Sequence, residues 1–124
     1  MKKYYNLILF LLVLFLTGCQ QTQAPKGNLV VDGSISIGVK NYGTPYFYGY
    51  VKNTGNNTVY NSEIAFTVYT DSTKNTIKAT ANGFPADLED ISPNVRAPFE
   101  AICFNLDTAE SITIYDYKIT WLDK

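Results

Sequence analysis

Short β-prone segments separated by turn-forming clusters run from Leu29 to Lys124, and this rhythm restricts the fold more than any other feature. The segments are rich in Val, Ile, Tyr, Phe and Thr, and the clusters between them in Gly, Asn, Asp, Ser and Pro. No segment has the period of an amphipathic helix. We therefore predict an all-β antiparallel β-sandwich of about seven strands. The first two segments count as one strand in the predicted set: 29–31 with 34–39, 46–53, 59–70, 76–82, 85–91, 99–106 and 111–121.

Alternating apolar residues show which face of several strands lies in the core, because successive side chains of a strand point to opposite faces. Three sets are each predicted to share a face: Ile35, Ile37 and Val39; Ile64, Phe66 and Val68; Ile112 and Ile114. Phe66 is predicted to be a core residue. The segment from Leu29 to Lys124 is long enough for one hydrophobic core and too short for two.

The first nineteen residues have the pattern of a lipoprotein signal. Lys2 and Lys3 precede the apolar run 7–16, which is too short for a bilayer-spanning helix. The next residues, Leu16-Thr17-Gly18-Cys19, resemble the lipobox of prokaryotic lipoproteins at all four positions. The resemblance implies that lipid is attached to the Cys19 sulfur and that the chain is cut before Cys19. The alternative is an ordinary signal peptide with a cysteine there by chance.

The resemblance to a lipobox implies how the chain is divided into segments and where in the cell the protein lies. Residues 1–18 form a cleaved signal peptide, 19–28 a lipidated cysteine with a flexible polar linker, and 29–124 the sandwich domain. The lipid on Cys19 would hold the protein on the cell membrane or the outer membrane, with its domain outside the cytoplasm.

The charge of the chain argues against nucleic acid as a partner. The net charge is −1, and loss of Lys2 and Lys3 with the signal peptide makes it −3. Nucleic-acid binding needs clustered cations, and no run of Lys or Arg is present. Attraction of the domain itself to anionic lipid is disfavoured for the same reason.

Cys103 would be the only thiol left once Cys19 carries lipid, so no intramolecular disulfide is expected. An unpaired cysteine in an exported protein is a buried core residue, a reactive thiol or one half of an intermolecular disulfide. The apolar neighbours Ala101, Ile102 and Phe104 favour the core.

The stretch YFYGYVKNTGNNTVYNSEIAFTVYTD resembles the FxLYD family, a prokaryotic immunoglobulin-like domain often attached to lipoprotein signals. The likeness covers about 46–124. Two departures fall in the signature: Val68 replaces Leu, and Thr70 stands where Asp is expected, with Asp71 one place late. Pro93-Asn94 replaces the usual Pro-Gly, and Asn is the next best residue for a left-handed conformation. The family has no common activity, so the likeness implies a fold and no mechanism.

The chain has no histidine, which argues against an enzyme of the Ser-His-Asp or Cys-His type and against a His-based zinc site. One dense acidic group, Asp87 with Glu89 and Asp90, admits a solvated segment, a calcium site or acid–base catalysis, of which we favour the first. Asp71 opens a segment with a partial likeness to a calcium loop, but Thr76 and Asn82 occupy the positions of its essential Gly and Glu. We expect no metal and no cofactor.

Tyr46, Tyr48 and Tyr50 alternate with Phe47, Gly49 and Val51, so one set faces the core and the other faces outward. Outward tyrosines either bind a partner or pack against neighbouring strands. The sequence therefore predicts a non-enzymatic binding module with an envelope protein or a cell-wall glycan as its partner. The first alternative is a carbohydrate-binding lipoprotein that uses these tyrosines, and the second is an enzyme.

Overall fold

The computed structural model describes residues 24–124, and within them the predicted all-β sandwich is confirmed. The predicted signal peptide and the lipidation site at Cys19 lie outside the described residues. The strands are β1 (Leu29–Val31), β2 (Ser36–Val39), β3 (Pro45–Asn53), β4 (Val59–Tyr69), β5 (Ile77–Gly83), β6 (Arg96–Ile102) and β7 (Ile114–Asp123). Two short 3-10 turns, η1 (Pro85–Leu88) and η2 (Ala109–Ser111), lie between strands.

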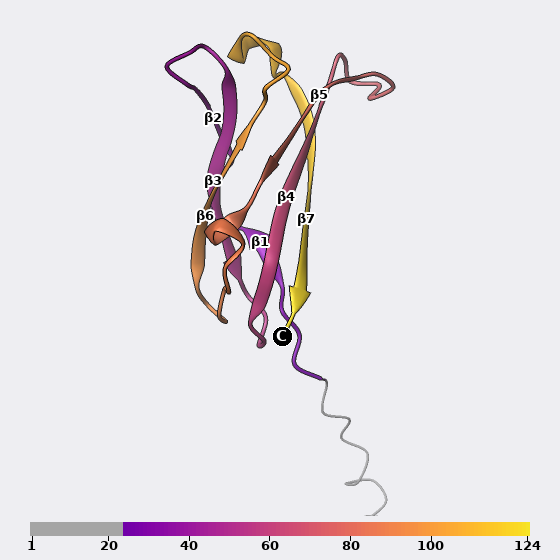
Figure 1. The fold of residues 1–124 in the computed structure, drawn as a ribbon. Coiled ribbons are helices and arrows are strands. Elements are labelled where there is room, and N and C mark those ends of the chain that lie inside the picture. Colours follow the sequence, from indigo (N-terminus) through magenta and orange to yellow (C-terminus); the bar gives the residue numbers. More distant parts are fainter. Residues whose placement is uncertain (1–23) are drawn as a thin grey trace, which may run out of the picture.

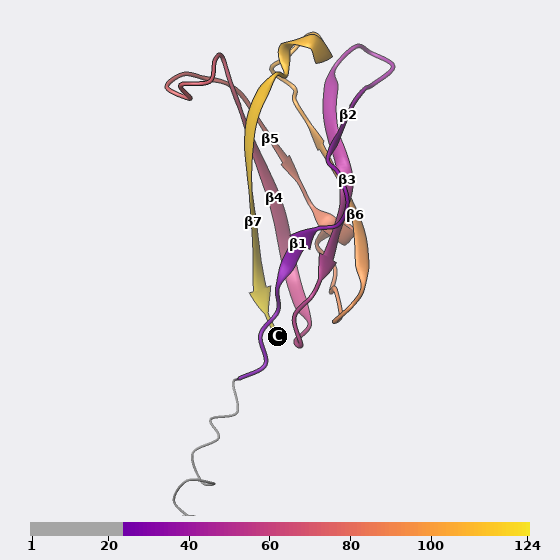
Figure 2. The ribbon, with the colours of Figure 1, turned by 180° about the vertical axis from the view of Figure 1, so that it is seen from behind.

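All strand pairs are antiparallel, and the sheet curls into two layers (Figures 1 and 2). One layer holds β3 and β6, with β1 and β2 on the free edge of β3, and the other holds β5, β4 and β7 in that order. The layers are joined through β5 and β6, which pair only at Gly83 and Ala101. A Cβ on Gly83 would lie 2.9 Å from the Glu100 carbonyl oxygen, so only glycine allows this close crossing.

The core lies between the two layers and is centred on stacked aromatic rings. Phe47 of β3 and Phe66 of β4 are almost parallel at 5°, with ring centroids 4.1 Å apart. Tyr115 of β7 tilts against Phe47 at 4.8 Å. The predicted burial of Phe66, together with Ile64 and Val68, is confirmed, and so is the inward orientation of Phe47 and Val51.

The predicted strand at 85–91 is wrong. Residues 85–88 form η1, and only Ile91 makes a bridge, to Val59. The physical reason is that only the two ends of the segment, Pro85 and Ile91, are buried, whereas Leu88 is 45% exposed, so no alternating face packs on the core.

The first predicted strand is interrupted. Residues 29–31 pair with one part of β3 and residues 36–39 with another, and Gly33 takes a positive φ of 90° between them. Ile37 and Val39 point inward, as their pairing with Phe47 and Pro45 requires. They are nevertheless 37% and 54% exposed, because β2 is an edge strand and nothing packs beyond it.

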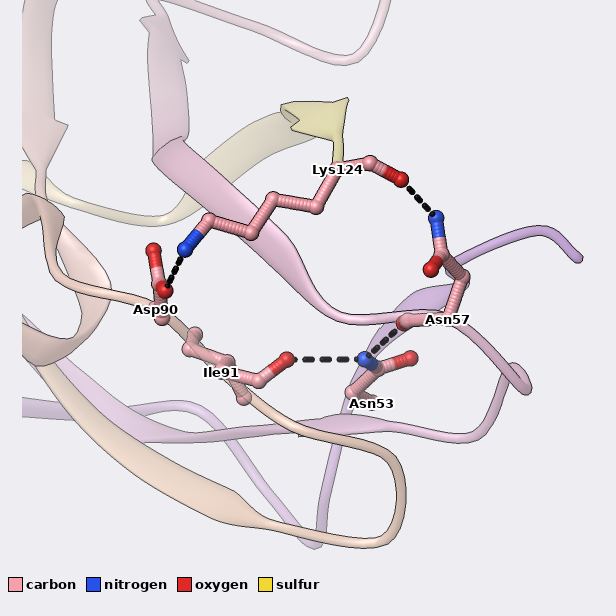
Figure 3. A network of polar contacts seen from close by, with 5 residues as sticks. All are labelled: Asn53, Asn57, Asp90, Ile91 and Lys124. Atoms are coloured by element: carbon pink, nitrogen blue, oxygen red, sulfur yellow. Dashed lines mark hydrogen bonds and ion pairs between the residues drawn. The ribbon is translucent and has the colours of Figure 1, made fainter.

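Asn53 is fully buried at the end of the sandwich where the described chain begins and ends, which we call the base (Figure 3). Its Nδ2 donates to the carbonyl oxygens of Asn57, at 2.8 Å, and Ile91, at 2.9 Å. Its Oδ1 accepts from the backbone N–H groups of Asn28 and Gly55. All hydrogen-bonding positions of the amide are thus used inside the protein.

The base also fixes both ends of the described chain. The backbone N–H of Lys26 donates to Asn56 Oδ1 at 2.7 Å, and that of Gly27 donates to Asp123 Oδ1 at 2.5 Å. The last residue is tied by the bond from Asn57 Nδ2 to the Lys124 carbonyl oxygen (Figure 3). Contacts of the sandwich therefore begin at Lys26, inside the segment expected to be linker.

Candidate functional site: the tyrosine hollow

The three tyrosines of β3 lie on the outer face of their layer, as their alternation with Phe47 and Val51 predicts. Tyr48 and Tyr50 are 42% and 43% exposed, whereas Tyr46 is half-buried. Tyr46 lies over Gly38 of β2, where a Cβ would meet its ring at 2.7 Å. Tyr46 and Tyr48 also contact one another, with ring centroids 5.3 Å apart. One tyrosine therefore packs on its neighbours, and two remain open to contact.

Two cations sit over rings of this row, and each is paired with an acid. The Lys40 ammonium lies 4.2 Å from the Tyr46 ring centroid and forms an ion pair with Glu100. The hydrogen bond to Glu100 raises the pKa of Lys40. At the other end of the row, the Arg96 guanidinium carbon lies 3.9 Å from the Tyr50 centroid. Arg96 Nε donates to the Asp32 carboxylate at 2.7 Å.

The turn η1 faces this row and is held from beneath. Pro85 is buried, and the buried Ser62 hydroxyl donates to its carbonyl oxygen at 3.4 Å. Ala86, Asp87 and Leu88 all have left-handed backbones, with φ of 52°, 51° and 70°. For residues other than glycine this conformation costs about 1 kcal/mol or more each. The packing of the turn must offset that cost. In this conformation, Phe84 and Asp87 lie beside the outer face of β3 and β6.

A hollow of about 390 Å³ lies between the tyrosine row and η1. We call it the tyrosine hollow. It is lined by Tyr48 and Tyr50 of β3, Pro98 and Glu100 of β6, and Phe84 and Asp87 at η1. Its volume falls within the range of small-ligand sites, and its walls combine aromatic side chains with two carboxylates.

A second hollow, of about 430 Å³, adjoins the first through Phe84. It lies beside the crossing of β5 and β6 and is lined by Thr80, Asn82, Phe84, Ile102, Phe104 and Asn105. Amide and hydroxyl groups replace the carboxylates here. The lining of the two hollows together extends along β6 from Pro98 and past the end of this strand to the exposed Phe104.

The acidic group predicted around Asp87 is divided by the fold. Asp87 lines the hollow, whereas Asp90 forms an ion pair with Lys124 at the base (Figure 3). Asp71 belongs to the β4–β5 turn, where its carboxylate accepts from the backbone N–H of Thr73 at 2.9 Å. Hydrogen bonds from Thr73 lower the pKa of Asp71. Within residues 24–124, no group of three or more acidic or cysteine side chains has the geometry to hold a metal ion.

Cys103 is buried, as predicted, and it is the one cysteine among residues 24–124. Burial raises the pKa of its thiol to about 11. A thiolate is the reactive form of cysteine, so this residue is protected both by its surroundings and by its protonation.

The sequence identified the tyrosines of the hollow but not its opposite wall. Phe84 falls between the predicted strands 76–82 and 85–91, Asp87 lies within the second of them, and Glu100 lies within the predicted strand 99–106. One signal was available: alternation with Ala101 and Phe99 places Glu100 and Pro98 on the outer face of β6. Pairing with β3 then sets Glu100 opposite Tyr48 and Pro98 opposite Tyr50.

Within residues 24–124, no helix is both long and apolar enough to span a bilayer. No protein-family model, curated protein or solved structure matches the chain.

Proposed function

We propose that this chain is a lipid-anchored protein of the cell envelope, and that its sandwich is a non-enzymatic binding module with the tyrosine hollow as its binding site. The observation that carries the proposal is the hollow itself. Exposed aromatic side chains dominate recognition surfaces because they bury a large area at a small cost in side-chain entropy. Tyr48, Tyr50 and Phe84 converge on one concave surface.

The lipid anchor is supported by the lipobox pattern that ends at Cys19, and the sandwich fold of the module agrees with the likeness to FxLYD domains around Phe66 and Tyr69. Anchoring and binding fit together in space. The described chain leaves the sandwich at its base (Figure 1). The residues that line the hollow place it on the outer face of β3 and β6. A partner could therefore reach the hollow from the side while the base faces the anchor.

A carbohydrate ligand is the second candidate, and the two adjoining hollows favour it. The C–H face of a sugar ring packs on an aromatic side chain such as Tyr48 or Phe84, and carboxylates such as Asp87 accept hydrogen bonds from hydroxyls. The amide-lined second hollow would take the next unit of a chain.

Acid–base catalysis has less support. Asp87 and Glu100 line the same hollow, but both are exposed, and Glu100 is already paired with Lys40. A catalytic pair of carboxyl groups needs contrasting environments, one of them desolvated, to hold one group protonated while the other is ionised.

Crosslinking in native membranes tests the binding module. Cells producing the wild-type chain, Tyr48→Ser or the control Tyr42→Ser would be crosslinked mildly, and the attached species identified by mass spectrometry. Tyr42 is 66% exposed in the β2–β3 turn, away from the hollow. We expect Tyr48→Ser to reduce one crosslinked species at least fivefold, with Tyr42→Ser equal to wild type. Equal yields from all three chains would refute binding at the hollow.

A further inference from the structure

The tyrosine row contains the same three-part arrangement twice. Tyr46 carries the Lys40 ammonium over its ring, and Glu100 holds that ammonium in place. Tyr50 carries the Arg96 guanidinium, which Asp32 holds. A cation is attracted to the negative face of an aromatic ring, and a nearby carboxylate adds a second attraction that holds the cation in place. In both cases β6 supplies one member of the pair, Glu100 or Arg96, and the other, Lys40 or Asp32, lies one residue beyond the end of β2 or β1.

Tyr48 lies between these two tyrosines, and it shares the hollow with the acidic residue Asp87 but has no cationic side chain over its ring within the described part of the chain. Among the described residues, no lysine or arginine lies over its ring. Asp87 lines the same hollow, and it forms no ion pair with any residue that the structure describes. The hollow therefore holds one carboxylate whose charge is not balanced by a neighbouring side chain.

We propose that the tyrosine hollow binds an organic ammonium group, which lies against Tyr48 and pairs with Asp87. This inference rests on the proposed binding function and names the chemistry of the ligand. The bound group would complete at Tyr48 the arrangement that Lys40 and Arg96 complete at the neighbouring rings. Phe84 and Pro98 supply the apolar wall that the carbon atoms around a charged nitrogen require.

The charge around the hollow favours a cation over an anion. Glu100 and Asp32 are neutralised by Lys40 and Arg96, which leaves Asp87 as the excess charge. An anionic ligand would be repelled by Asp87, and a neutral one would gain hydrogen bonds from it but no attraction between opposite charges. Because the site is open to water, the expected affinity is in the millimolar range and falls as salt is added.

Choline and 3,3-dimethylbutan-1-ol provide the sharpest test, because they have the same shape and only choline is charged. The full chain would be purified in a nonionic detergent and titrated with each ligand, and with N-acetylglucosamine as a neutral sugar. Binding would be followed through the NMR signals of Tyr48, Gly49 and Glu100. The variants are Asp87→Asn and Tyr48→Leu. The control, Asp116→Asn, removes an exposed carboxylate from β7, on the other layer.

We expect choline to saturate and to bind at least tenfold more tightly than its neutral counterpart. Asp87→Asn and Tyr48→Leu should each weaken choline binding about three- to tenfold, and Asp116→Asn should leave it unchanged. Equal shifts from choline and the neutral alcohol, or an unaffected Asp87→Asn, would overturn the inference. Saturation by N-acetylglucosamine without choline binding would also overturn it, while the binding function would stand. If Tyr48→Leu does not fold, the affinity of Asp87→Asn for choline, compared with that of wild type, decides whether the inference holds.

Discussion

The Cys103 thiol links the packing of one residue to the pH dependence of stability. Burial raises its pKa to about 11 in the folded protein, from an ordinary value of 9.0. Above pH 9 the unfolded chain loses this proton while the folded chain retains it. The unfolded state then binds fewer protons, and the free energy of unfolding falls with rising pH. Below about pH 8 the thiol is protonated in both states, and it has no effect on the pH dependence.

We therefore predict a loss of stability between pH 9 and 11 that depends on Cys103. Denaturant melts of wild type and Cys103→Ala would be compared at each pH. The wild type should lose up to about 2–3 kcal/mol more than the variant across this interval. Lysines and tyrosines titrate in the same interval in both chains, so only the difference between the slopes is informative. Parallel curves would mean that the thiol is not buried.

Phe66 tests the aromatic stack of the core. Phe66→Ala removes the partner of Phe47 and leaves a cavity between the two layers. The expected cost is about 3–5 kcal/mol, a large share of the stability of a domain this size. Thr67→Ala, one position along on the outer side of β4, should cost less than 1 kcal/mol. Chemical denaturation measures both, and similar midpoints for the two variants would contradict the assigned faces.

Among the elements, those with a clear two-residue alternation were predictable. The faces of β3 and β4 follow from Phe47, Val51 and Phe66, since each points an apolar side chain inward beside polar or tyrosine neighbours. Ile37 has the same pattern, but sequence alternation cannot tell an edge strand from a central one. The left-handed turn at Ala86 was missed because nothing local requires it: Pro85 and Ser62, which hold it, lie far apart in the sequence.

For the same reason only half of the tyrosine hollow could be predicted. Tyr48 and Tyr50 are visible within one strand. Phe84 and Asp87 reach the hollow only because η1 folds back over β6, and that depends on the close crossing at Gly83. Contacts of this kind are fixed by tertiary packing, which no local pattern records.

Asn53 connects three separate elements at the base, and its removal should loosen all of them. Asn53→Ala leaves the buried carbonyl of Ile91 without this donor, and the N–H groups of Asn28 and Gly55 without their acceptor. We expect a loss of about 3 kcal/mol. Hydrogen exchange should accelerate at Asn28 and Gly55.

Asn57→Ala is the matched control, because it removes an amide whose hydrogen bond to Lys124 is exposed. It should cost less than 1 kcal/mol. If both variants lose the same stability, the buried network is not the source of the effect.

At the scale of the whole molecule, the proposed anchor depends on one sulfur atom. Cys19→Ala should abolish incorporation of labelled palmitate, prevent cleavage before residue 19 and remove the protein from the detergent phase. Cys103→Ala is the matched control, because the chain has only these two cysteines. It should retain both label and partitioning. Labelled palmitate on the Cys19→Ala chain would contradict the lipobox interpretation.

The base brings the two ends of the described chain together. The order of the strands along the chain could therefore be changed without changing which strands pair in the sheet. Gly27 and Asp123 are in hydrogen-bonding contact, so a short glycine-rich loop could join the ends. A circular permutant opened in the exposed turn 71–75 would preserve every strand pair, including those around the hollow. Such a permutant should fold and retain the hollow, while its new termini emerge at the opposite end of the sandwich from the ends of the described chain (Figures 1 and 2).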